Sequence, residues 1–263
     1  MNLSQEHKRT ILPIKSVEQL VGSYLVAETI AEIREEYAED LATQGLESIP
    51  PLNGTFDEEV KLLYKEAANI IKYKPVLVYI LKYGLEDLDK YKFKESPSVI
   101  IAASADSSHL QQSFGQAYKD LAKTNLYDHT INVFREALNI AKKKGRPASM
   151  SISIVGALLH DFGKSELIRK EILGTATSKG YKAHAEVSAS YVSEILSVKL
   201  FNEFNELPAE TIETIADLVK KHHPNNQQDK KDTYISFIIE ADHAARKYEY
   251  RNLMSDKAKN GSY

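Results

Sequence analysis

The segment SMSISIVGALLHD, residues 149–161, is apolar on almost every side of the helix that it would form. A helix with a single apolar stripe lies at a surface, whereas a helix that is apolar all round must be enclosed by other elements. The sequence therefore predicts a central, buried helix. Its neighbours should be helical too, because no run of alternating apolar and polar residues is long enough to indicate a sheet. We expect an all-α fold.

Capping residues and prolines indicate where the other helices begin. In the first half of the chain, helices are expected to begin at Ser16, at Thr55, at Pro75 and at Ser96 followed by Pro97. In the second half, amphipathic patterns predict four more helices over residues 125–145, 184–196, 208–224 and 232–250. Together with the apolar helix, these four make a five-helix set.

Composition limits the classes of function. The chain has 263 residues and no cysteine, so disulfides and thiolate metal ligands are excluded. A formal net charge of −3 argues against a protein that coats nucleic acid. The first residues, MNLSQEHKRTILPIK, lack the apolar run of a signal peptide, and no segment is long enough for a membrane span. We therefore expect a cytoplasmic protein with no membrane partner.

Histidine and aspartate residues recur through the five-helix set. If these helices pack as a bundle, side chains from facing helices can converge at one interior point, as in other helical metal proteins. Imidazole and carboxylate ligands suit iron, manganese, cobalt, nickel or zinc better than copper(I). The series comprises His129 in LYDHT, His160 and Asp161 in LLHDFGK, His184 in KAHAEVSA, His222 and His223 in KKHHP, and Asp242 in EADHAAR.

This ordered series resembles the HD-domain superfamily of metal-dependent phosphohydrolases, and the resemblance covers residues 120–250. The full series is similar to the binuclear branch of that superfamily, which includes cyclic-dinucleotide phosphodiesterases and HDIG-type ribonucleases. The blocks HAE, HH and ADxxAR are similar to the ribonucleases. The resemblance implies an HD-domain helical bundle over residues 119–252. The rest of the sequence predicts a helical N-terminal region of unknown role (1–118) and a flexible tail (253–263).

The resemblance also implies a set of metal ligands. The first metal would be held by His129, His160, Asp161 and Asp242, and the second by His184 with His222, His223 or both. Asp161 would bridge the two ions, and a hydroxide shared between them would attack the phosphate ester. We expect two divalent ions, iron or manganese first, with magnesium, zinc, cobalt or nickel as alternatives.

Two residues of the HDFGK motif have separate expected roles. The resemblance assigns Lys164 to the phosphate of the substrate, so that Asp161 and Lys164 are the expected catalytic residues. Gly163 is expected to let the chain turn and to let substrate approach the backbone.

Other interpretations of single residues stay open. His222 and His223 could simply be favourable cations at the end of a helix, where the dipole is negative. Asp242 could be an ion-paired carboxylate, although its largely apolar helix would make it costly to bury without a partner. Asp128 could orient His129 or cap a helix. For Arg246, one turn after Asp242, an ion pair on the helix surface is preferred over contact with phosphate.

The expected function is cleavage of a phosphodiester or phosphomonoester of a nucleotide or nucleic acid. The partner would be that phosphate-ester substrate, and a homo-oligomer is one option for assembly. In the family that the chain resembles, a phosphodiesterase branch carries GYP after its paired histidines. This chain has HHPNNQQDK instead, so the resemblance does not imply specificity for cyclic dinucleotides. Two alternatives stay open: a nuclease or conjugation-associated DNA-processing factor, and a non-catalytic regulatory module that keeps its metals.

Overall fold

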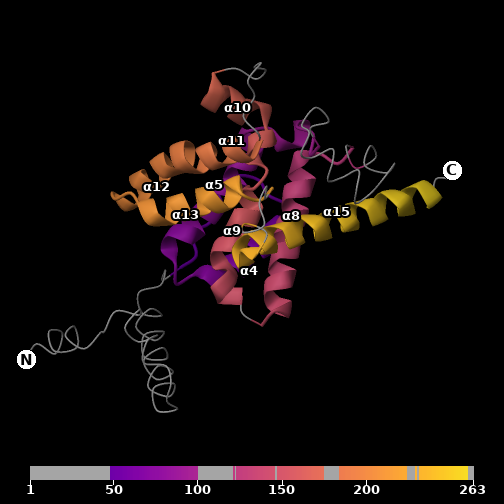
Figure 1. The fold of residues 1–263 in the computed structure, drawn as a ribbon, viewed down its shortest axis with the longest axis horizontal. Helices are drawn as coiled ribbons and strands as arrows, with labels where there is room; N and C mark the ends of the chain where they lie inside the picture. Colours follow the sequence, from indigo (N-terminus) through magenta and orange to yellow (C-terminus); the bar gives the residue numbers. More distant parts are fainter. Residues whose placement is uncertain are drawn as a thin grey trace, which may run out of the picture. The chain divides into compact units, whose positions relative to one another are not determined.

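The computed structural model describes residues 48–99, 121, 123–145, 147–174, 184–223, 229 and 231–259. These residues lie in one compact unit, Glu47–Tyr263. They form helices and no β-strand, with one isolated bridge between Pro97 and Asn125 (Figure 1). The all-α prediction is therefore confirmed. Among the described helices, none combines the length and the apolar character needed to cross a membrane.

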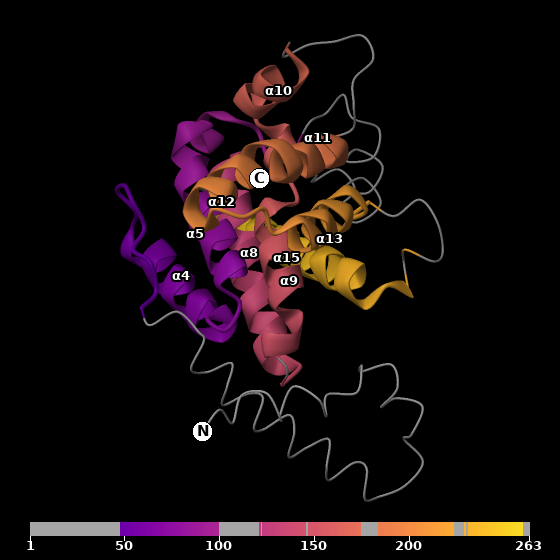
Figure 2. The same cartoon turned by 90° about the vertical axis from the view of Figure 1, so that its left-hand side faces the viewer.

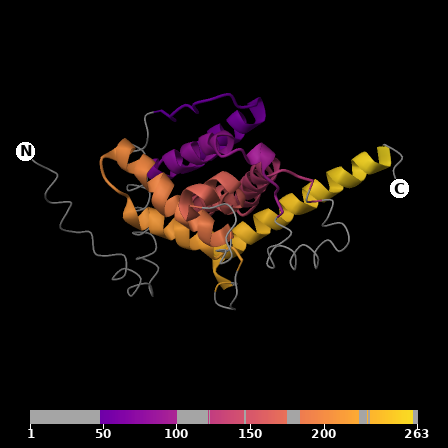
Figure 3. The ribbon, with the colours of Figure 1, turned by 90° about the horizontal axis from the view of Figure 1, so that it is seen from above.

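The apolar segment forms the central helix α9 (Ser151–Leu159), as predicted. Its side chains are almost all buried, because helices surround it on several sides. Figure 2 shows α9 between α5 and α13, and Figure 3 shows the same layers from above. The helices that pack against α9 are α4 (Glu58–Ile71), α5 (Pro75–Lys90), α8 (Leu126–Lys143), α13 (Ala209–Lys220) and α15 (Thr233–Lys259).

Shorter elements complete the described part of the chain. The turn after α9 contains the 3-10 helix η4 (Phe162–Lys164) and leads into α10 (Glu166–Leu173). Helix α11 (His184–Ser190) continues through a π-helical stretch, η5 (Tyr191–Leu196), into α12 (Ser197–Phe204). The helix predicted over 184–196 is thus present and extends further. The remaining 3-10 helices are η1 (Phe93–Glu95) and η3 (Pro147–Met150).

Several predicted helix starts can be compared with the structure. Pro75 is in the first turn of α5, as expected. Helix α4 begins at Glu58 rather than near Thr55, because the side chain of Asp57 accepts a hydrogen bond from the backbone of Val60 at 2.8 Å and caps the helix there. The helix expected from Ser16 lies outside the described residues.

The helix expected at Ser96 and Pro97 does not begin there, so this prediction is wrong. The segment is extended instead, because it is hydrogen-bonded to the start of α8. Ser96 accepts from the backbone N–H of Leu126 at 2.8 Å, and Ser98 donates to the carbonyl of Thr124 at 3.2 Å. These bonds hold the segment before residue 100 against the start of α8.

The last described residues of the chain are helical. Helix α15 runs to Lys259, so residues 253–259, predicted as the start of a flexible tail, are helical. Tyr250 and Leu253 pack against buried Val99 and Leu121, which gives this end of α15 an apolar contact. Figures 1 and 3 show α15 extending beyond the other helices.

Helices α4 and α5 lie in the predicted N-terminal region but belong to the same compact unit as the bundle. They pack against each other and against α9. Part of the region predicted over residues 1–118 therefore contributes to the core around the candidate site.

Candidate metal centre

His160 and His222 are positioned by the same local device. Each follows or ends a helix, and its Nδ1 lies against the backbone carbonyl three residues earlier: 2.8 Å from the oxygen of Ala157 and 2.6 Å from that of Val219. A carbonyl oxygen only accepts, so Nδ1 carries the proton in both rings. Each Nε2 is therefore left as a lone pair that faces the interior.

His129 lies in the first turn of α8 and is completely buried. Its Nδ1 is 2.8 Å from Oε1 of Glu249 on α15. Its Nε2 faces the opposite way, 3.4 Å from Oδ2 of Asp161 and 3.3 Å from Oδ1 of Asp242. His129 thus follows the same pattern as the other two rings, with a carboxylate in place of a carbonyl.

Asp161 lies between two groups of side chains. Its Oδ2 faces one group, at 3.4 Å from Nε2 of His129 and 3.2 Å from Nε2 of His160. Its Oδ1 faces the other, at 3.3 Å from Nε2 of His184 and 3.7 Å from Nε2 of His222. The two oxygens of one carboxylate therefore serve two separate clusters.

The second cluster consists of imidazole rings alone. His184, at the start of α11, has its Nε2 3.3 Å from that of His222 and 3.0 Å from that of His223. His184 and His222 are buried, and His223 is half-buried. Three imidazole nitrogens at this spacing can be satisfied together by one cation, and the same holds for the first cluster of His129, His160 and Asp161.

The pKa shifts follow from this crowding. Burial alone would raise the pKa of Asp161, but His160, Lys164 and His129 outweigh burial and hold it well below its usual value. Burial and the neighbouring histidines lower the pKa of His222 well below 6.5, so this ring is neutral and available as a ligand. For His129, burial and Arg246 disfavour the proton, but Glu249, Asp161 and Asp242 outweigh them and raise the pKa to about 10.

Asp242 completes the first cluster from α15. Its side chain is 20% exposed, yet its Oδ1 is enclosed and faces His129. Burial would raise the pKa of Asp242, but the histidines His129 and His160 outweigh it and keep the carboxylate ionised. The structure therefore brings together every residue that the sequence predicted as a ligand.

Unsatisfied atoms test whether these residues fit a metal. Four buried atoms of the predicted ligands have no hydrogen-bond partner: Nε2 of His129, Nε2 of His160, Oδ1 of Asp161, which faces the second cluster, and Oδ1 of Asp242. Buried polar atoms without a partner are costly, so most native structures avoid them. Imidazole nitrogens and carboxylate oxygens are the donor atoms that divalent metals take. The residues present fit a metal centre.

Gly163 has a different role from the one predicted. A Cβ on this residue would lie 2.1 Å from the backbone oxygen of His184 and 2.8 Å from the backbone nitrogen of Ser188. The backbone of Gly163 also donates to Oγ of Ser188 at 2.7 Å. Glycine is therefore required by the contact with α11, which sets His184 against Asp161, and α11 rather than substrate occupies the space beside it.

Lys164 is buried beside the first cluster. Its Nζ lies 2.8 Å from Oδ2 of Asp161 and 3.1 Å from the carbonyl oxygen of Ser98. Its positive charge is thus next to the carboxylate of Asp161.

Two charged residues of α15 differ from the sequence predictions: Arg246 was expected on the surface, and Glu249 was not predicted as part of the site. Arg246 is not on the surface, as preferred from the sequence, but buried, with its guanidinium 3.0 Å from both Oγ and the carbonyl oxygen of Ser98. It also donates to Oε2 of Glu249 at 2.9 Å. The spacing of Asp242, Arg246 and Glu249, four and then three residues, places all three on one helix face and could have indicated them.

Asp128 is exposed and does not contact His129, and the residue that caps α8 is Asn125. The side chain of Asn125 accepts from the backbone of Asp128 at 2.8 Å and donates to its Oδ2 at 2.9 Å. The carboxylate that contacts Nδ1 of His129 belongs to Glu249 instead.

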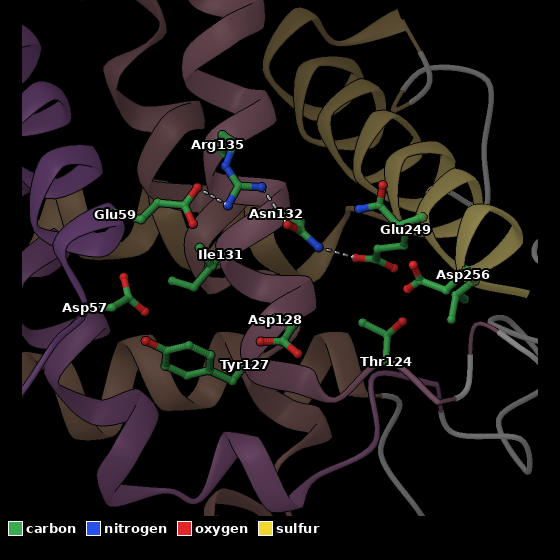
Figure 4. A pocket seen from close by; sticks show the side chains of 12 residues that line it. Asp57, Glu59, Thr124, Tyr127, Asp128, Ile131, Asn132, Arg135, Glu249 and Asp256 are labelled. Atoms are coloured by element: carbon green, nitrogen blue, oxygen red, sulfur yellow. Dashed lines mark hydrogen bonds and ion pairs between the residues drawn. The ribbon is translucent and has the colours of Figure 1, made fainter. Parts of the chain in front are cut away.

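A pocket of about 340 Å³ lies on the other side of Glu249, between α4, α8 and α15 (Figure 4). Figure 4 shows the carboxylates of Asp57, Glu59 and Asp256 around it, with Arg135 paired to Glu59. None of the predicted metal ligands lines this pocket. It is therefore separate from the candidate metal centre, although Glu249, which contacts His129, lines it.

Comparison with known proteins gives one result. Residues 126–253 match the family model of the HD domain. No curated protein and no solved structure shows a significant match. The matched range begins at the first residue of α8 and ends within α15, so it contains every predicted ligand.

Proposed function

Because residues 126–253 belong to the HD domain family, whose members are generally metal-dependent phosphohydrolases, we propose that this chain is a phosphohydrolase with two divalent metals. The proposed reaction is hydrolysis of a phosphodiester or phosphomonoester of a nucleotide or nucleic acid. The observation that carries the proposal is the position of Asp161, whose two oxygens face two separate clusters.

Each cluster would hold one ion. His129, His160, Asp161 and Asp242 would hold the first, and Asp161 with His184, His222 and His223 would hold the second. When bound, two divalent ions supply a hydroxide nucleophile near neutral pH and positive charge for the phosphate oxygens. We propose that both ions are iron or manganese.

The protein's own residues prepare the site. The carbonyls of Ala157 and Val219 keep the protons of His160 and His222 on Nδ1, so that Nε2 is ready as a ligand. Lys164 sits next to Asp161 and would meet the phosphate of the substrate as a fixed positive charge. This charge favours an anionic substrate over a neutral one.

The proposal is tested by Asp161→Asn, which nearly preserves volume but removes the bridging charge. Wild-type protein reconstituted with Mn²⁺ or Fe²⁺ should contain two ions per chain and hydrolyse an aryl phosphodiester, an aryl phosphomonoester or a polynucleotide. Asp161→Asn should lose metal and hydrolysis together. The control is Asp128→Asn, the same change at the exposed residue next to His129 in the first turn of α8, which should keep both.

Other outcomes of this experiment would contradict the proposal or favour one of the two alternatives. A fully metallated, active Asp161→Asn contradicts the proposal. Two metals with no turnover on any phosphate ester favour the regulatory module. Hydrolysis restricted to single-stranded polynucleotide, and steeply weakened by salt, favours the nuclease.

A further inference from the structure

Glu249 lies seven residues after Asp242, about two turns further along the same face of α15. It is 4% exposed, and its carboxylate contacts three side chains. Oε1 lies 2.8 Å from Nδ1 of His129 and 3.2 Å from Nδ2 of Asn132. Oε2 accepts from Arg246 at 2.9 Å. The carboxylate is thus held at both oxygens and faces the back of a ligand ring.

The direction of these bonds determines the tautomer of His129. An ionised carboxylate only accepts, so the Nδ1 of His129 is the donor. Arg246 and Asn132 also donate to this carboxylate, so it is held in place against the ring of His129. Nε2 then faces Asp161 and Asp242 without a proton of its own when a metal is bound.

The Nδ1 of His129 has a stronger hydrogen-bond acceptor than the Nδ1 of His160 or His222. His160 and His222 donate to neutral backbone carbonyls, whereas His129 donates to a charged side chain. Hydrogen bonds to charged groups are stronger, and a carboxylate partner makes the ring a more basic ligand. His129 lies in the first turn of α8, the first helix of the matched region.

We propose that Glu249 is a positioning residue of the metal centre, which orients His129 and keeps its proton on Nδ1 so that Nε2 can bind the first metal. The inference rests on the proposed function, because it concerns His129 as a ligand. Arg246 extends the same arrangement, since it joins Glu249 to Ser98 in the segment before residue 100. Ser98, which lies outside the matched range, is thus connected to Glu249 through Arg246.

The first test is the affinity of each site for Co²⁺, followed by visible absorption in titrations of the full chain. Glu249→Gln keeps the shape of the side chain and removes its charge. It should weaken Co²⁺ binding about 10- to 100-fold at one site, the site that His129→Ala abolishes, and leave the other unchanged. Asp256→Asn is the control, because it removes a charge from the same pocket wall without contacting His129.

The second test observes the ring itself. In protein loaded with Zn²⁺ and labelled with ¹⁵N-histidine, the Nδ1 proton of His129 should be slow to exchange and shifted downfield. In Glu249→Gln this resonance should move upfield and exchange faster. If Glu249 only stabilised the fold, the variant would melt earlier and the resonance would not move, which would overturn the inference.

Folding is checked by circular dichroism in chelator. If Glu249→Gln does not fold, Glu249→Asp keeps the charge beside Arg246 but withdraws it from His129, and should show a smaller loss at the same Co²⁺ site. Unchanged Co²⁺ affinity in the folded variants overturns this inference alone. Wild-type protein that binds no Co²⁺ overturns the proposed function and, with it, the inference.

Discussion

Gly163 controls how closely two parts of the candidate centre approach each other. It follows the His160–Asp161 pair by two residues and lies against the backbone of α11, which carries His184. Backbone atoms cannot rotate away as the end of a side chain can. A single added methyl group would therefore push α11, and His184 with it, away from Asp161.

We predict that Gly163→Ala lowers the free energy of unfolding by at least about 3 kcal/mol, the upper part of the range for overpacked interiors. It should also lose metal from the second cluster. Gly84→Ala is the comparison, because its Cβ would meet the end of the Leu159 side chain at 3.0 Å, which can shift. The gain in helix propensity, about 1 kcal/mol, should offset that cost. Denaturant unfolding and metal analysis measure both, and equal effects would contradict the role given to Gly163.

Lys164 is a residue whose role in catalysis can be tested separately from metal binding. It contacts Asp161 but donates protons only, so it cannot bind a metal while charged. We predict that Lys164→Met keeps the metal content and lowers hydrolysis of phosphate esters about 100-fold, as removal of a charge-stabilising donor does. Lys170→Met, at an exposed lysine paired with Glu166, should have no effect. Steady-state kinetics decide, and equal rates for the two variants would remove Lys164 from the catalytic set.

Among the elements, α15 combines the most functions. One face carries Asp242, Arg246 and Glu249 at the centre, and its later turns pack on Val99 and Leu121. The contact ties the end of the helix to the segment that Arg246 also holds. The later turns of α15 therefore contribute to the stability of the site.

We predict that Leu253→Ala lowers the free energy of unfolding by about 1–2 kcal/mol, less than for a fully buried leucine because this side chain is only partly buried. Met254→Ala, at a neighbouring residue that is 45% exposed, should change it by less than about 0.5 kcal/mol. Urea denaturation in chelator separates packing from metal binding. If both substitutions changed the free energy of unfolding equally, the packing of Leu253 would contribute nothing to stability.

For the whole molecule, bound metals would act as cross-links among helices. The predicted ligands come from α8, from the end of α9, from α11, from the residues after α13 and from α15. Ions that bind only the folded state stabilise it by RT ln(1 + [L]/Kd), about 2.7 kcal/mol per ion at a concentration of 100 Kd. Stability and metal binding are therefore coupled.

We predict that a chelator lowers the melting temperature of the wild-type protein and hardly changes that of Asp161→Asn. The reason is that only the wild type has ions to lose. Calorimetry with and without chelator on both proteins gives the result. A wild type whose melting temperature is unaffected by chelator would show that the clusters do not hold metal in the folded protein.

Much of the fold follows from local sequence. The central helix was predicted from its uniformly apolar residues, and Pro75 correctly indicated the start of α5. The segment at Ser96 was predicted wrongly, because its capping signal is local while its backbone hydrogen bonds go to Thr124 and Leu126. Where the partner is distant in the chain, the local pattern was not enough.

The candidate site divides in the same way. By itself, the sequence determined which residue types recur, in which order and on which helices, because ligand chemistry restricts the types and helix periodicity gives their faces. Only the tertiary structure decided that Glu249 supports His129, 120 residues away, and that Arg246 reaches Ser98, 148 residues away. It also decided that Gly163 meets α11. Such contacts arise when helices pack, and packing between distant segments leaves no regular spacing in the chain.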